Sequence, residues 1–89
     1  MWMDEKEISE EMYAKCLTND KKEFWTLITD SEWAFIYCTK IKNRSEVRKH
    51  ITDSEWCYCY CINVEDRPDV RKNITDPTWL YFYNEKKKN

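Results

Sequence analysis

The strongest constraint in this sequence is a hexapeptide that occurs three times. It reads Ile-Thr-Asp-Ser-Glu-Trp at positions 28–33 and again at 51–56, and a diverged copy, Ile-Thr-Asp-Pro-Thr-Trp, covers 74–79. The interval is 23 residues on both occasions. A fixed interval of this length is typical of tandem structural repeats, in which each unit packs mainly on its neighbours. We therefore expect a repeat protein.

The hexapeptide is expected to begin a helix in each copy. Asp53 is a candidate N-cap for the middle copy, and Thr52 with Glu55 fits a capping box that would place the cap one residue earlier. In the third copy Pro77 replaces Ser54. Proline is favoured at the first helical position, so this replacement supports a helix start at the same place.

A second, shorter helix is expected after a polar break in each unit. It would cover Ser45–Ile51 in one unit and Pro68–Ile74 in the next. Each segment carries a valine and an isoleucine four residues apart, which gives the helix one apolar edge. We therefore predict a single all-α domain, 1–89, that forms a small α-solenoid of about three and a half two-helix repeats. Its parts would be a degenerate N-terminal repeat at 5–28, repeats at 29–51 and 52–74, and a C-terminal half repeat at 75–89.

The long helices should carry a wide apolar stripe. At 100° per residue, Trp33, Trp56 and Trp79 begin this stripe in successive units, and we expect them to stack in consecutive layers of the core. The last unit is apolar at five consecutive positions, Trp79–Tyr83, which is more than one neighbouring repeat can cover. A homodimer that buries Trp79, Leu80 and Phe82 is therefore expected.

A second aromatic row lies opposite the tryptophan stripe, at Phe35, Tyr58 and Tyr81. If the row is exposed, it predicts a surface for a protein partner, because exposed aromatic rows often mark interaction sites. If the helices are buried nearly all round, the same row is core. The sequence leaves both interpretations open.

Basic side chains are expected along the outer edge of the short helices. Arg48, Arg71, Lys49 and Lys72 occupy equivalent places in two units. Such a stripe could meet phosphates or an acidic protein surface, or it could only keep the outer face solvated. The whole chain gives no preference for nucleic acid, because 15 Lys and Arg stand against 17 Asp and Glu.

Composition argues against several other classes of function. The chain has no glycine, so Gly-rich phosphate loops are excluded. Cys57, Cys59 and Cys61 resemble a metal motif, but residues two apart on a helix point about 200° from one another, so the three thiols cannot converge on one ion. No catalytic spacing is present. We expect no enzyme, no metal and no cofactor, and reduced cysteines in a cytoplasm, because neither an export signal nor a membrane span is evident.

The segment Asp30–Lys49 carries a family resemblance. Asp-Ser-Glu-Trp-Ala-Phe-Ile-Tyr-Cys, followed by Arg-Ser-Glu-Val-Arg-Lys, resembles the short tandem repeats with an Asp-Pro-Glu-Trp-Ala-x-x-Tyr-Ala core that occur in phage and bacterial proteins. The resemblance implies a small helical repeat protein of phage or mobile-element origin, with no catalytic residues. We expect a non-enzymatic protein-binding module, in sharper form a phage-type inhibitor or adaptor that acts in the host cytoplasm on a defence or nucleic-acid enzyme. The alternative is a nucleic-acid-associated protein that binds phosphates through the basic stripe.

Overall fold

The computed structural model describes residues 3–88, and these residues form α-helices without any strand. The all-α prediction is confirmed for this part of the chain; residues 1, 2 and 89, which the expected domain bounds include, lie outside it. Four long helices alternate with three helices of four residues. The long helices are α1 (Glu5–Thr18), α3 (Ser31–Lys40), α5 (Ser54–Asn63) and α7 (Pro77–Lys87). The short helices are α2 (Lys22–Trp25), α4 (Ser45–Arg48) and α6 (Pro68–Arg71).

The aspartate of each hexapeptide is the N-cap of a long helix, as predicted. The Asp30 carboxylate accepts a hydrogen bond from the backbone N–H of Trp33 at 3.0 Å, and the Asp76 carboxylate accepts one from Thr78 at 2.8 Å. Asp53 has the same extended backbone, but its side chain makes no capping hydrogen bond. Pro77 occupies the first turn of α7, where its missing N–H costs no helical hydrogen bond.

The short helices end earlier than the sequence predicts. Helix α4 ends at Arg48 and α6 at Arg71, three residues before the isoleucines that were expected to close them. The chain then tightens, so that the N–H of Ile51 bonds the carbonyl of Arg48 at 2.9 Å. This tight turn leads directly into the next capping aspartate. Ile51 remains only 1% exposed, so the apolar edge is preserved although the helix is shorter.

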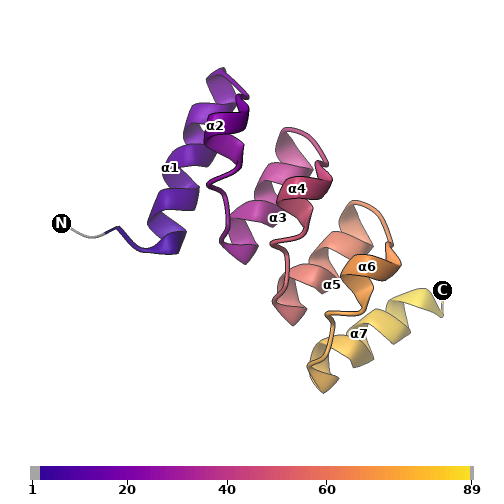
Figure 1. Cartoon of the computed structure of the whole chain (residues 1–89). Coiled ribbons are helices and arrows are strands. Elements are labelled where there is room, and N and C mark those ends of the chain that lie inside the picture. Colours follow the sequence, from indigo (N-terminus) through magenta and orange to yellow (C-terminus); the bar gives the residue numbers. More distant parts are fainter. Residues whose placement is uncertain (1–2, 89) are drawn as a thin grey trace.

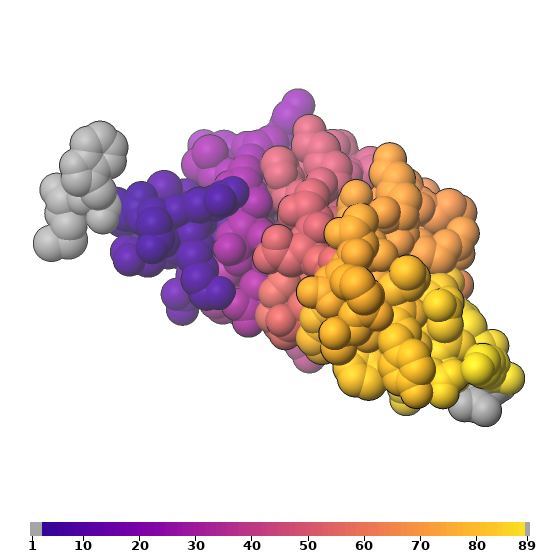
Figure 2. Space-filling model, turned by 90° about the horizontal axis from the view of Figure 1, so that it is seen from below, coloured from indigo at the N-terminus to yellow at the C-terminus, as the bar shows by residue number. Residues whose placement is uncertain are grey.

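The long helices lie side by side, with the short helices along one flank and the termini at opposite ends (Figure 1). Helices α1, α3 and α5 each contact the next long helix, and each also contacts the short helix that follows it in the chain. We call each of these long helices with its following short helix a unit, and α7 alone the C-terminal unit. Successive units form consecutive slices of an elongated body (Figure 2), whose extents are 43 × 26 × 16 Å.

One continuous core runs through these units. Tyr37 and Tyr60 are its largest fully buried side chains, and Ile28 and Ile51 are buried beside the short helices. Trp33, Trp56 and Trp79 are half-buried and pack against this core at its margin. The tryptophans therefore contribute to packing, but the tyrosines four residues later in each long helix are more completely buried.

Candidate functional site

A serine on each of the first three long helices bonds it to the unit that follows. Each serine Oγ accepts hydrogen bonds from two consecutive backbone N–H groups at 2.9–3.1 Å. These N–H groups precede the next long helix and have no helical acceptor of their own, so the serine satisfies them. The sets are Ser9 with Thr29 and Asp30, Ser31 with Thr52 and Asp53, and Ser54 with Thr75 and Asp76.

A buried tyrosine on each later long helix bonds back to the unit before it. The hydroxyl group donates to an aspartate or asparagine 17 residues earlier, in the break before the preceding short helix. The pairs are Tyr37 with Asp20 at 2.7 Å, Tyr60 with Asn43 at 2.9 Å and Tyr83 with Asp66 at 2.9 Å. Adjacent units are therefore joined in both directions, and their register is fixed by buried polar contacts.

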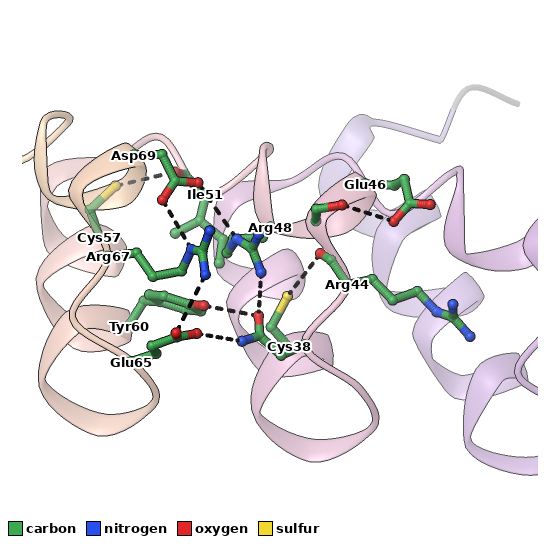
Figure 3. Close-up of polar contacts among 12 residues, drawn as sticks. Cys38, Arg44, Glu46, Arg48, Ile51, Cys57, Tyr60, Glu65, Arg67 and Asp69 are labelled. Atoms are coloured by element: carbon green, nitrogen blue, oxygen red, sulfur yellow. Dashed lines mark hydrogen bonds and ion pairs between the residues drawn. The ribbon is translucent and has the colours of Figure 1, made fainter.

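A ring of polar contacts, which includes Arg48, Glu65 and Asp69, joins the second and third units (Figure 3). The Asn43 side-chain oxygen accepts from Arg48, and its amide donates to Glu65. Arg67 pairs with Glu65 and Asp69 at 3.4 and 3.0 Å, and Arg48 closes the ring on Asp69 at 3.7 Å. Most of these groups are solvent-accessible, so we assign the ring a role in orientation more than in stability.

The contacts of this ring change which residues of the expected basic stripe can contact a ligand. Arg48 is only 9% exposed, and Arg71 donates to Asp66 and to the Tyr83 hydroxyl, so both guanidinium groups are directed to internal acceptors. Lys49 and Lys72 are exposed, and they border a groove of about 320 Å³ between α4 and α6. A smaller groove of about 210 Å³ lies between α2 and α4. The cationic groups that can meet a ligand here are therefore lysines.

The aromatic residues form a band across the long helices. Phe35 and Tyr58 of the second aromatic row, and Tyr13 in the first unit, each pack on the tryptophan of the next unit, with ring centroids 5.3–5.4 Å apart. The pairs, which we call the aromatic band, are Tyr13 with Trp33, Phe35 with Trp56, and Tyr58 with Trp79. All six side chains are half-buried. Phe35 and Tyr58 are therefore neither fully exposed nor fully buried, since they pack on a neighbour and remain partly accessible.

Helix α7 presents the most exposed apolar side chains of the C-terminal unit. Leu80 is 41% exposed, Tyr81 59% and Phe82 42%, and we call these three residues the α7 face. Tyr81 stands where Phe35 and Tyr58 stand in the earlier units. No tryptophan of a following unit covers it in the part of the chain that the structure describes. Trp79, by contrast, is half-buried against Tyr58 and contributes less to the exposed surface.

The cysteines are free thiols, and four of the five are buried. Burial raises the pKa of Cys38 to about 11 and that of Cys57 to about 12. Cys59 is half-buried, and burial raises its pKa as well. Among residues 3–88, no group of three His, Cys, Asp or Glu side chains converges on a point that could hold a metal ion.

These thiols should react slowly with alkylating reagents in the folded protein. We expect Cys57 to be alkylated by iodoacetamide at neutral pH at least about tenfold more slowly than in urea, because little thiolate forms and access is poor. Cys59 should be modified first. Peptide mass spectrometry of a time course measures both rates, and equal rates for Cys57 and Cys59 in the folded protein would contradict the packing described above.

The Asp66 carboxylate accepts a hydrogen bond from the Tyr83 hydroxyl group, and it should make the stability of the folded protein depend on pH. Burial raises the pKa of Asp66, but hydrogen bonds from Lys87 and Tyr83 and the charges of Lys87 and Arg71 outweigh it, so the pKa lies below its usual value. A carboxyl group with a depressed folded-state pKa stabilises the protein above its unfolded pKa of about 4, and this stabilisation is lost as pH falls through the folded pKa.

We therefore expect Asp66→Asn to lose less stability than the parent protein between pH 5 and pH 3 (about one unit either side of the ordinary value). Asn43 occupies the equivalent place one unit earlier, so asparagine is a matched replacement. Urea midpoints at the two pH values measure the effect. An identical acid-induced loss in both proteins would show that Asp66 does not carry this dependence.

No helix between residues 3 and 88 combines the length and the apolar composition that crossing a membrane requires. No protein-family model, curated protein or solved structure matches this chain. The surfaces described above are therefore the basis for assigning a function.

Proposed function

We propose that the chain is a small α-solenoid of about three and a half tandem two-helix repeats, and that it acts as a non-enzymatic protein-binding module. Its units recur every 23 residues, and equivalent serine and tyrosine hydrogen bonds join each unit to the next. Such an arrangement displays the same side-chain positions at regular intervals along one face. Repeat scaffolds of this kind suit recognition of an extended surface.

The observation that carries the proposal is the aromatic band. Three pairs of aromatic rings cross all four long helices and remain half-exposed. Tryptophan and tyrosine dominate the energetics of protein interfaces, because they bury a large apolar area with few rotatable bonds. Each ring is already held against its neighbour, so little side-chain entropy would be lost when a partner binds.

The partner that fits this band is a protein with an apolar patch ringed by polar groups. The helices that carry the band also carry exposed charged residues of both signs, including Glu55 on α5 and Lys40 on α3. A sharper form of the proposal is a phage-type inhibitor or adaptor that blocks a host defence or nucleic-acid enzyme. The resemblance of Asp30–Lys49 to phage and bacterial tandem repeats supports that form, together with the small size of the chain.

The experiment is affinity capture from a bacterial lysate with the parent protein and band variants. Tyr58→Ser removes one ring of the band, and we expect it to lose at least tenfold in recovery of a specific partner. Tyr58→Phe keeps the ring, and Leu27→Ser alters an exposed apolar residue outside the band, so both should retain the partner. Thermal melting checks that each variant is folded. A partner bound equally by folded Tyr58→Ser would exclude the band as the binding surface.

The alternative, binding of nucleic-acid phosphates beside the short helices, is supported by the exposed Lys49 and Lys72 at the edge of the larger groove. With Arg48 and Arg71 bonded internally, two phosphate contacts are the main ones available. Two contacts predict a slope of about −2 in log affinity against log salt for duplex DNA. Filter binding across a salt series measures this slope, and Lys49→Glu with Lys72→Glu should abolish the binding if it occurs.

A further inference from the structure

The groove of about 320 Å³ between α4 and α6 carries an excess of positive charge. Three cationic side chains and one anionic side chain line it, namely Arg48, Lys49, Lys72 and Asp69. The Asp69 carboxylate is already bound, because Arg67 donates to it at 3.0 Å and Arg48 lies 3.7 Å away (Figure 3). The charge that remains free in the groove is therefore that of the lysines.

The two lysines come from the two short helices that border the groove. Lys49 is the C-cap residue of α4, and Lys72 is that of α6. Both are exposed, and within residues 3–88 neither ammonium group has a carboxylate within 4 Å. Two unpaired ammonium groups at one groove suit an anionic group that accepts from both of them.

The remaining lining residues suit a segment of polypeptide. Ile51 and Val70 line the groove at 1% and 2% exposure, so its base offers apolar atoms and no charge. Asn73 is half-buried beside them, and no hydrogen bond joins its side-chain amide to another of the described residues. A glutamate side chain has methylene groups for the apolar base and a carboxylate for the lysines, and an asparagine amide can bond a peptide group next to it.

The smaller groove, between α2 and α4, has less free positive charge. Lys22 and Lys49 line it, but so does Glu46, whose carboxylate has no cationic group within 4 Å in the part of the chain that the structure describes. Burial and the neighbouring charge of Lys49 lower the pKa of His50, so this side chain is mainly neutral at pH 7. The larger groove is therefore the better site for an anionic group.

An acidic protein segment fits these short helices better than a nucleic-acid strand does. Each short helix carries one exposed acidic residue, at Glu23, Glu46 and Asp69. The phosphates of a nucleic acid follow one another without interruption, so a strand that crosses the three helices would meet these carboxylates as well as the lysines. A protein segment can carry its carboxylates only where the lysines are.

We propose that the groove between α4 and α6 binds a glutamate-rich segment of a protein partner, with a carboxylate held between Lys49 and Lys72. This inference rests on the proposed protein-binding function and deepens it, because it gives the chemistry of a second contact with the partner. The contact lies on the short helices, whereas the aromatic band lies on the long helices. Each surface can therefore be tested without the other.

Fluorescence anisotropy with a labelled peptide tests the groove. The probe is a fluorescein-labelled peptide of alternating glutamate and alanine, and a second peptide has glutamine in place of glutamate. We expect the parent protein to bind only the glutamate peptide, and Lys72→Ala to weaken this binding about threefold to fivefold, as the loss of one exposed ion pair should. Lys22→Ala removes the same charge beside the smaller groove and should change the affinity by less than about twofold. Tyr58→Ser should bind the peptide as the parent does.

Several results would overturn the proposal. A parent protein that does not bind the glutamate peptide would do so, as would equal losses from Lys22→Ala and Lys72→Ala, which would indicate attraction by overall charge alone. A single-stranded oligonucleotide of equal length that binds more tightly than the peptide would assign the groove to phosphates instead. A loss of peptide binding in folded Tyr58→Ser would place the peptide on the aromatic band. Since the capture experiment tests that band separately, a failure of the groove would leave its result unchanged.

Discussion

Tyr60→Ala is expected to bring the protein close to complete unfolding. Tyr60 is fully buried, and its hydroxyl group donates to Asn43 at 2.9 Å across the contact between two units. Removing a buried aromatic ring costs about 3–5 kcal/mol, and a domain of this size has about 5–10 kcal/mol in total. The variant therefore keeps little of the stability, and chemical denaturation followed by far-ultraviolet circular dichroism measures the loss.

Two other tyrosine variants separate packing from hydrogen bonding. Tyr60→Phe keeps the ring and removes only the bond to Asn43, so we expect a loss of about 1–2 kcal/mol. Tyr81→Ala removes an exposed ring, and at concentrations where the protein is monomeric it should change stability by less than about 0.5 kcal/mol. A Tyr60→Ala midpoint equal to that of Tyr81→Ala would show that Tyr60 does not join the units.

Ser9→Ala should produce the second largest effect. Its Oγ atom accepts from the N–H groups of Thr29 and Asp30, and alanine would leave both donors without an acceptor. A buried unsatisfied donor costs about 1–3 kcal/mol, so we expect a loss of about 2–4 kcal/mol in the free energy of unfolding. Water can replace the serine more easily where the site is open. The loss should therefore decrease from Ser9 (0% exposed) to Ser31 (8%) and then to the half-buried Ser54.

Ser45→Ala serves as the control for this series. Ser45 is exposed at the start of α4, and its hydroxyl group contacts only the neighbouring Glu46. Its replacement should cost less than about 0.5 kcal/mol in urea denaturation. If Ser9, Ser31 and Ser45 gave equal small losses, the double hydrogen bonds between units would have no energetic role.

Features that depend on local chemistry could be predicted from the sequence. The long helices begin after Asp30, Asp53 and Asp76, because a side-chain oxygen before the first turn and a proline within it are strong local signals. The sequence predicts the first residues of the short helices α4 and α6 correctly. It places their last residues too late, because the helices end at Arg48 and Arg71. Their ends are decided by the turn into the next unit, which is a tertiary requirement.

Features that depend on contacts between units were not predicted. Arg48 was expected on the outer edge, yet its guanidinium group is drawn inward by Asn43, which comes from the break before α4. A signal for this contact exists in the sequence, since Asp20, Asn43 and Asp66 follow one another at intervals of 23 residues. The sequence identifies Ser31 and Ser54 only as residues at the start of a helix. Their role as acceptors for the next unit could not be derived without knowing how closely the helices approach.

The aromatic residues show why helix angles alone give an incomplete description. A helical projection places Phe35 and Trp33 on opposite sides of α3, which suggests one exposed and one buried row. In the structure Trp33 packs on Tyr13 of the preceding unit and Phe35 on Trp56 of the following unit, so both are half-buried. The partner-binding roles of Phe35, Tyr58 and Tyr81 remain predictions for the capture experiment, as does that of Lys49 and Lys72 for the salt series.

Duplication of residues 52–74 within the chain tests most directly whether the 23-residue segment is the structural unit. The inserted copy would receive contacts that already exist elsewhere, such as a tyrosine bonded to Asp66 and a tryptophan packed on Tyr58. We expect a folded protein with unchanged helical content per residue and a higher thermal midpoint, since each added unit contributes another contact between neighbours. A lower midpoint, or a loss of helical signal per residue, would contradict it.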